Sequence, residues 1–314
     1  MNKLMLKKQY MLYLKVRDVV PSIETIYNMP IALREAGCVL DGDYLYIFGG
    51  KLSEATQART NKVDRLNVKT LEYESNIATI PLTIANFGIE KSDRKVYLIS
   101  GAYSSSYPWN SNNIYIFDLD TFQFETLSGI IPNTNGYQGI QGMATALINN
   151  ASIYIFGGSN ANGRMTQIRK FDIASKTLTT LSATLPNAVT SIDACANGTD
   201  IYIFGGWISG DRLNTIWKFD TTTSTITTIN TMPYKVSDYA IFKKGLKVYI
   251  IGGYNDNGFI KNIILYDIES NVSSTISLEL SIAMGYMGFA YNKNECYSVG
   301  GDDSNGSLNI IQKI

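Results

Sequence analysis

Short apolar runs, rich in β-branched and aromatic side chains, recur along the whole chain between clusters of Gly, Pro, Asn and Asp. Runs of about four to eight such residues with these boundaries are typical of β-strands. No segment shows the 3.6-residue apolar period of an amphipathic helix. The pattern of apolar and polar positions therefore predicts an all-β protein.

One six-residue phrase, IYIFGG, stands at 153–158 and again at 201–206, and related phrases occur in four other places. Those places are 45–50, 96–101, 248–253 and 296–301. The last glycines of successive phrases are 51, 57, 48, 47 and 48 residues apart. A period near 50 residues is that of four-stranded propeller blades. The spacing predicts six blades.

Each repeat divides into four strands, named a to d in chain order. Strand a is a mixed apolar run such as REAGCVL (34–40), and strand b is the phrase that ends at the glycines. Strand c is a recurring pattern such as NTIWKFD (214–220), and strand d is a Thr-rich run such as TITTINTMP (225–233). We expect each blade to be one antiparallel four-stranded sheet.

These features resemble the kelch-repeat β-propellers over essentially the whole chain, which implies a six-bladed kelch-type propeller. Ser100 replaces the first glycine in the second repeat, and the last repeat ends in NIIQKI (309–314) without the aromatic–Asp pair. We expect the paired glycines where strand b leaves the sheet near the central channel, because backbones crowd there and the turn needs φ values open to glycine. The pairs stand at 49–50, 157–158, 205–206, 252–253 and 300–301.

The last repeat ends after its strand c, and the N-terminal stretch SIETIYNMP (22–30) matches the d strands. We therefore expect residues near 22–28 to supply the outer strand of the last blade and close the ring. Deleting residues 1–30 should then destabilise the whole domain. Residues 21–314 would form the propeller and residues 1–20 an N-terminal arm. Whether residues 10–17 add a strand inside or outside the propeller stays open.

The composition of the chain excludes several kinds of binding and catalytic site. The chain has 27 basic and 27 acidic residues without a basic stripe, which argues against nucleic-acid binding. It has no histidine, so His-based catalysis and nearly all zinc, copper and haem sites are excluded, and we expect no metal and no cofactor. Cys38, Cys195 and Cys296 have no CxxC spacing, which predicts apolar fillers in strands.

Nothing in the sequence predicts targeting to a membrane. Lys7, Lys8 and Lys15 interrupt the only N-terminal apolar stretch, so we expect no signal peptide. No window approaches 18 apolar residues, so no membrane insertion is expected. We expect a cytoplasmic protein or one that is assembled in a particle.

The loops divide between two faces of the predicted disc. In an antiparallel blade the d–a and b–c loops share one face, and the a–b and c–d turns share the other. The c–d turns follow Asp118, Asp172, Asp220 and Asp267, whose carboxylates can accept backbone N–H bonds, so we interpret them as structural. Binding usually resides on loops carried by a rigid scaffold.

The b–c and d–a loops hold aromatic side chains beside Arg, Asp and Asn, a mixture that suits protein hot spots and sugar stacking. Trp207 and Tyr254 both follow a glycine pair directly, in adjacent blades. The alternative is that such aromatics only pack on one another to cap blade ends, as we expect of Trp217 in the blade-to-blade core. The predicted binding face comprises Arg34, Tyr103, Trp109, Tyr137, Arg164, Trp207, Asp211, Arg212, Tyr234, Asp238, Tyr254 and Tyr286.

Three functions remain as hypotheses. The kelch resemblance implies a non-enzymatic binding module, which would recognise a protein or a surface glycan. The composition also suits a structural or receptor-recognition subunit of a microbial or phage tail or baseplate, which would assemble with other chains through the N-terminal arm. A sugar epimerase-like enzyme would need an Arg and a carboxylate to converge at the channel mouth. Candidates for that pair are Arg34, Glu35, Arg164, Asp211, Arg212 and Asp238.

Overall fold

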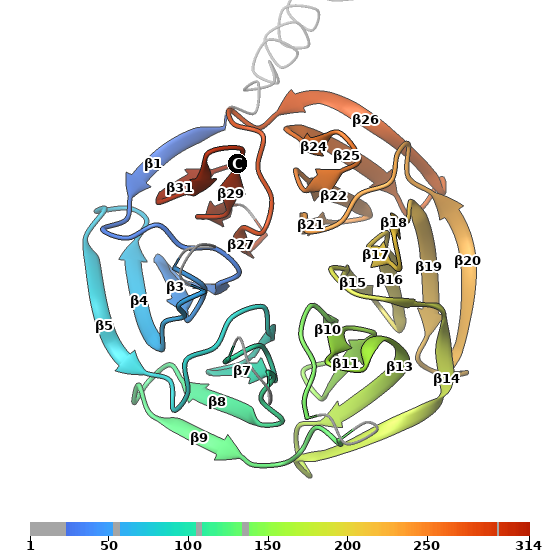
Figure 1. The fold of residues 1–314 in the computed structure, drawn as a ribbon, viewed down its shortest axis with the longest axis horizontal. Coiled ribbons are helices and arrows are strands. Elements are labelled where there is room, and N and C mark those ends of the chain that lie inside the picture. Colours follow the sequence, from blue (N-terminus) through green and yellow to red (C-terminus); the bar gives the residue numbers. More distant parts are fainter. Residues whose placement is uncertain (1–22, 53–56, 105–108, 134–137, 294) are drawn as a thin grey trace, which may run out of the picture.

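The computed structural model describes residues 23–52, 57–104, 109–133, 138–293 and 295–314. This part of the chain contains no α-helix, and six antiparallel sheets stand in a ring around a central axis (Figure 1). No helix in these ranges is long and apolar enough to span a bilayer. The predicted six-bladed β-propeller is confirmed.

The first five blades follow one another along the chain, each with strands a to d from the axis outwards (Figure 1). Blades one and two consist of β2 (Gly37–Asp41), β3 (Tyr44–Phe48), β4 (Lys62–Asn67) and β5 (Tyr73–Thr79), then β6 (Gly88–Ser92), β7 (Lys95–Ile99), β8 (Ile114–Asp118) and β9 (Phe124–Leu127). Blade three consists of β10 (Ala144–Ile148), β11 (Ser152–Phe156), β13 (Gly163–Asp172) and β14 (Thr177–Val189). Blades four and five consist of β15 (Asp193–Asn197), β16 (Asp200–Phe204), β19 (Thr215–Asp220) and β20 (Thr225–Thr231), then β21 (Ala240–Lys244), β22 (Lys247–Ile251), β25 (Asn262–Asp267) and β26 (Val272–Glu279).

Both ends of the described chain build blade six. Its strands are β27 (Gly288–Tyr291), β28 (Cys296–Val299), β31 (Ile310–Lys313) and, outermost, β1 (Glu24–Asn28). β1 runs antiparallel to β31, as the match of residues 22–30 to the d strands predicts. Tyr27 of β1 stacks on Tyr73 of blade one, with ring centroids 5.3 Å apart. The N-terminal arm at 1–20 and the question of residues 10–17 lie outside the described residues.

Aromatic and branched side chains fill the spaces between blades. Trp217 is 1% exposed and packs with Tyr154 and Phe156 of blade three, so its predicted place in the blade-to-blade core is confirmed. Phe219, two residues further along the same strand, meets Phe156 edge to face at 5.6 Å. Burial of one such ring contributes about 1.5–3 kcal/mol, which explains why the strand c pattern carries an aromatic residue before its Asp. The three cysteines are buried and unpaired, as expected of apolar fillers.

The paired glycines join each blade to the next. The N–H of Gly50 donates to the carbonyl of Ile84, at 2.8 Å, and the same bond recurs at all six junctions. Gly49 has a φ of +54°, and a Cβ on it would lie 2.5 Å from that carbonyl oxygen. The expected need for positive φ is therefore confirmed. The expected position of the glycine pairs near the channel is wrong. Strand a lines the channel, and the glycines pack closely against the d–a segment of the neighbouring blade.

Ser100 keeps the glycine geometry at the junction of blades two and three. Its φ is +58°, and its hydroxyl accepts the N–H of Ile140 at 2.7 Å. The same hydroxyl lies 2.7 Å from the carbonyl of Ile140. These bonds to the next blade offset the cost of a positive φ in a residue with a Cβ.

The aspartates at the c–d turns are structural, as predicted. Asp118 accepts the backbone N–H groups of Asp120 and Thr121, at 2.8 and 2.9 Å. Asp220 accepts the hydroxyl and the N–H of Thr222, which lowers its pKa to about 2. Asp172 and Asp267 bind their own turns in the same way.

Candidate functional site

The face that carries the b–c and d–a loops, here called the loop face, has a regular backbone framework. In each blade the residue after the second glycine forms an antiparallel bridge to the d–a segment that leads into strand a. Trp207, for example, exchanges two backbone hydrogen bonds of 2.8 and 3.1 Å with Thr190. The six bridges are Arg34–Lys51, Ala85–Ala102, Gln141–Ser159, Thr190–Trp207, Ser237–Tyr254 and Gly285–Asp302.

Among the described residues, blades three to six extend this framework with a small hairpin on the b–c loop. Blade three pairs β12 (Ser159–Asn160) with the start of β13, and blade four pairs β17 (Trp207–Ile208) with β18 (Asp211–Arg212). Blades five and six repeat the arrangement with β23 (Tyr254–Asn255) and β24 (Gly258–Phe259), then β29 (Asp302–Asp303) and β30 (Gly306–Ser307). In these four blades the loop face is therefore carried on short β-hairpins.

A closed ring of six backbone hydrogen bonds surrounds the mouth of the channel. The N–H of Glu35 donates to the carbonyl of Tyr286 at 2.8 Å, the N–H of Tyr286 donates to Asp238, and the series returns to Glu35 through the other blades. All six residues have a φ between +54° and +62°. They are Glu35, Asn86, Gly142, Ser191, Asp238 and Tyr286. Sequence reasoning missed this ring because five of its positions carry side chains where a left-handed backbone usually signals glycine.

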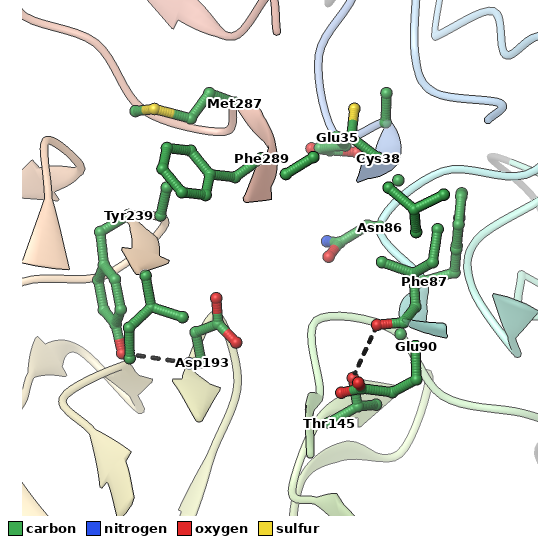
Figure 2. Close-up of a pocket in the computed structure, with 18 of the residues that line it drawn as sticks. Glu35, Cys38, Asn86, Phe87, Glu90, Thr145, Asp193, Tyr239, Met287 and Phe289 are labelled. Atoms are coloured by element: carbon green, nitrogen blue, oxygen red, sulfur yellow. Dashed lines mark hydrogen bonds between the residues drawn. The ribbon is translucent and has the colours of Figure 1, made fainter. Parts of the chain in front are cut away.

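Behind the ring, the channel is a cavity of about 540 Å³ lined mainly by the a strands. Figure 2 shows Asp193 pointing into the open centre and Glu90 beside Thr145. Burial raises the pKa of Glu90 to about 8 and that of Asp193 to about 7. Within the described ranges no group of three or more His, Cys, Asp or Glu side chains could hold a metal ion. The channel therefore carries carboxyl groups that titrate near neutral pH.

Arginine and aromatic side chains stack from blade to blade on the loop face. The guanidinium of Arg164 lies 3.8 Å from the ring centroid of Trp207, and that of Arg212 lies 4.7 Å from Tyr254. Both arginines occupy the same hairpin position, opposite the residue that follows the glycine pair. The hairpins of blades three and four thus each place a cation over the aromatic residue of the next blade, a favourable contact with the ring quadrupole.

The stack continues into blades five, six and one. Phe259 occupies the hairpin position of the arginines and meets Tyr254 edge to face at 5.0 Å. The ring centroids of Phe259 and Tyr286 are also 6.2 Å apart. The guanidinium carbon of Arg34 lies 4.7 Å from the centroid of the Tyr286 ring. We call the whole set the aromatic arc: Arg164, Trp207, Arg212, Tyr254, Phe259, Tyr286 and Arg34. Phe259 was missed from sequence, although its register with Arg164 and Arg212 was the signal that could have found it.

Carboxylates neutralise two of the arginines in the arc. Arg34 is 8% exposed and forms ion pairs with Asp302 and with Glu35. Arg212 forms an ion pair of 3.2 Å with Asp256 and donates to the hydroxyl of Ser237.

An Arg and a carboxylate therefore do meet at the channel mouth, as the epimerase hypothesis requires. Arg34, however, is buried between the ring of Tyr286 and two carboxylates that belong to blades one and six. The charge of Arg34 is therefore already neutralised within the protein.

The other predicted face residues have varied surroundings. Trp109 is exposed in the b–c loop of blade two, whereas Tyr103 packs on the core between blades one and two. Tyr234 packs on the core between blades four and five, and Asp211 forms an ion pair with Lys235. Asp238 belongs to the backbone ring and accepts the hydroxyl of Ser237. Tyr137 lies outside the described residues.

Comparison with protein families gives one match. A family model described as the KLHDC2/KLHL20/DRC7 Kelch-repeats domain matches residues 83–301, more than two thirds of the chain. The matched range begins just before blade two and ends at the last glycine pair. Comparison with curated proteins finds no match.

Proposed function

We propose that this protein, which belongs to the kelch-repeat family, is a binding module that holds a protein partner on its loop face. Kelch propellers are typically protein-interaction modules and are generally non-enzymatic. The observation that carries the choice of face is the aromatic arc, which spans blades three to six and returns to blade one. Trp, Tyr and Arg are the residues most enriched in binding hot spots.

The arc suits binding because its side chains are already ordered. Stacking fixes the guanidinium planes over the rings, and the hairpins fix the backbone beneath them. A partner then binds without the usual cost of about 0.5–1.5 kcal/mol for each flexible side chain that it immobilises. Trp207, at 40% exposed, is the member of the arc with the largest open apolar surface, and we assign it as the anchor.

A purified variant carrying Trp207→Ala and Tyr254→Ala tests the proposal. Partners are captured from an extract of the source cells with immobilised wild-type protein, identified, and measured again as purified proteins. We expect the double variant to bind roughly 30-fold more weakly, the effect of about 2 kcal/mol lost at a hot spot. Leu246→Ala is the control, because Leu246 is an exposed apolar residue in the a–b turn of blade five, on the opposite face. Wild-type affinity in the double variant would rule out this face.

The same proteins separate the other hypotheses. Binding of the wild-type protein, but not of the double variant, to a glycan array would indicate that the ligand of this face is a sugar and not a protein. Light scattering that shows self-association or co-assembly, unaffected by the double variant, would favour a structural subunit. Turnover of acylated amino sugars, abolished by Arg34→Met, would favour the epimerase hypothesis.

A further inference from the structure

Arg169 is a charged residue in the core between blades two and three. It lies in β13, is 2% exposed, and shares a face of the strand with Phe171, which packs with Tyr97 and Ile99 of blade two. Met165 of the same strand belongs to the same core. A guanidinium at this depth has lost its hydration and needs other groups to replace it.

The corresponding position in the other blades shows how this depth is normally filled. Asp64 in blade one accepts the hydroxyl of Tyr73 at 2.7 Å, and Tyr115 in blade two is bonded to Asn113 at 3.1 Å. Gln312 in blade six donates to Ser281 at 2.6 Å. The two remaining residues, in blades four and five, are the apolar Trp217 and Ile264. Each polar residue in this column except Arg169 therefore has a nitrogen or oxygen atom as its hydrogen-bond partner.

Arg169 lacks such a partner within the described residues. Its Nε and Nη1 atoms are buried without any hydrogen bond, and Nη2 contacts only the thioether sulfur of Met165 at 3.6 Å. Burial lowers the pKa of Arg169, yet an arginine stays protonated in proteins. Gln167, whose Oε1 is also buried without a partner, could supply a hydrogen bond but no negative charge.

We propose that Arg169 binds a small inorganic anion, chloride in the cell, between blades two and three through its Nε group. An anion at the Nε–H satisfies this donor and neutralises the charge together, which neither a water molecule nor an amide does. Met165 follows Arg164 directly, so the anion stabilises the base of the hairpin that carries the first member of the aromatic arc.

Thermal unfolding of the full chain tests the site. Gluconate is replaced stepwise by chloride up to about 150 mM at constant ionic strength. We expect the Tm of the wild-type protein to rise saturably by roughly 2–4 °C, because a ligand that binds only the folded state stabilises it. Arg169→Met should show no such rise and should exceed the wild-type Tm when chloride is absent. Arg65→Met, which removes a more peripheral arginine of blade one, should keep the wild-type response.

Two results would overturn the site. One is a chloride response that is absent in the wild-type protein or equally large in Arg169→Met. The other comes from wild-type crystals grown in sodium bromide, which need no variant to fold. An anomalous bromide peak within about 3.5 Å of Arg169 Nε is expected, and a map without it contradicts the proposal.

Discussion

The backbone N–H of Gly301 donates a hydrogen bond of 2.8 Å to the carbonyl of Leu33, which joins the last glycine pair to the segment that leads into blade one. The equivalent hydrogen bond connects each of the other five pairs of neighbouring blades. The junction where the chain closes therefore has the geometry of the five internal junctions. The pairing of β1 with β31 adds a second connection at the same place.

Gly300→Ala should destabilise the fold by about 2–4 kcal/mol. Its φ is +57°, and a Cβ there would lie 1.8 Å from the carbonyl oxygen of Leu33, so both backbone strain and a clash oppose the substitution. Gly42→Ala is the matched control, with a φ of +58° and no atom within 4 Å of the added Cβ. It should cost about 1 kcal/mol. Chemical denaturation measures both, and equal losses would contradict a steric role for the junction.

Removal of residues 1–30 should lower the Tm of the whole propeller in one cooperative transition. The deletion takes away β1, leaves the edge of β31 unpaired and removes Tyr27 from its stack on Tyr73. A chain that starts at residue 23 retains β1 and serves as the reference. Differential scanning calorimetry compares the two, and identical unfolding curves would show that β1 does not hold the ring closed.

Arg34→Ala should destabilise the fold by about 3 kcal/mol, because it leaves the buried Asp302 carboxylate and the partly buried Glu35 carboxylate without their cation. Arg94→Ala is the control. Arg94 pairs with Asp41 and Asp120 at the surface, where an ion pair contributes less than about 1 kcal/mol. Urea denaturation of both variants gives the comparison. Similar losses would mean that burial does not strengthen the Arg34 pairs.

Stability should fall as the pH rises from about 5 to 8. Burial raises the pKa of Glu90 from 4.5 to about 8, so the folded state holds this proton more tightly than the unfolded chain. The resulting stabilisation is complete below the unfolded pKa and is lost as the pH passes the folded pKa. Asp193, raised to about 7, acts in the same direction.

Glu90→Gln should flatten this dependence and stabilise the protein by about 1–3 kcal/mol at pH 8.5, because the amide carries no charge into the channel. Glu269→Gln, at an exposed turn, is the control and should leave the pH profile unchanged. Tm values from pH 5 to 9 provide the measurement. A wild-type profile without any decline over this range would contradict the burial of Glu90.

Much of the loop face could be predicted from single residues, because a loop after a glycine pair has a known place in a blade. Trp207, Tyr254 and Arg212 were found in this way, and the structure stacks Arg212 on Tyr254. Phe259 was not singled out, since its importance depends on its contact with Tyr286 in another blade. Sequence also placed Tyr234 on the face, whereas its partly buried ring packs against the core between blades four and five.

The sequence alone determined the number of blades, their strands, the turns at Asp118 and its equivalents, and the strand that closes the ring. Each of these depends on a local property that repeats along the chain: an alternating apolar pattern, a turn that needs positive φ, or a short side chain that bonds its own backbone. Only the tertiary structure decided the ring of left-handed residues through Glu35 and Asp238, the carboxyl groups in the channel, the aromatic arc and the isolation of Arg169. These features arise between blades, because closure of the ring brings together segments that are far apart in sequence. It also buries charged side chains that no local sequence pattern identifies as buried.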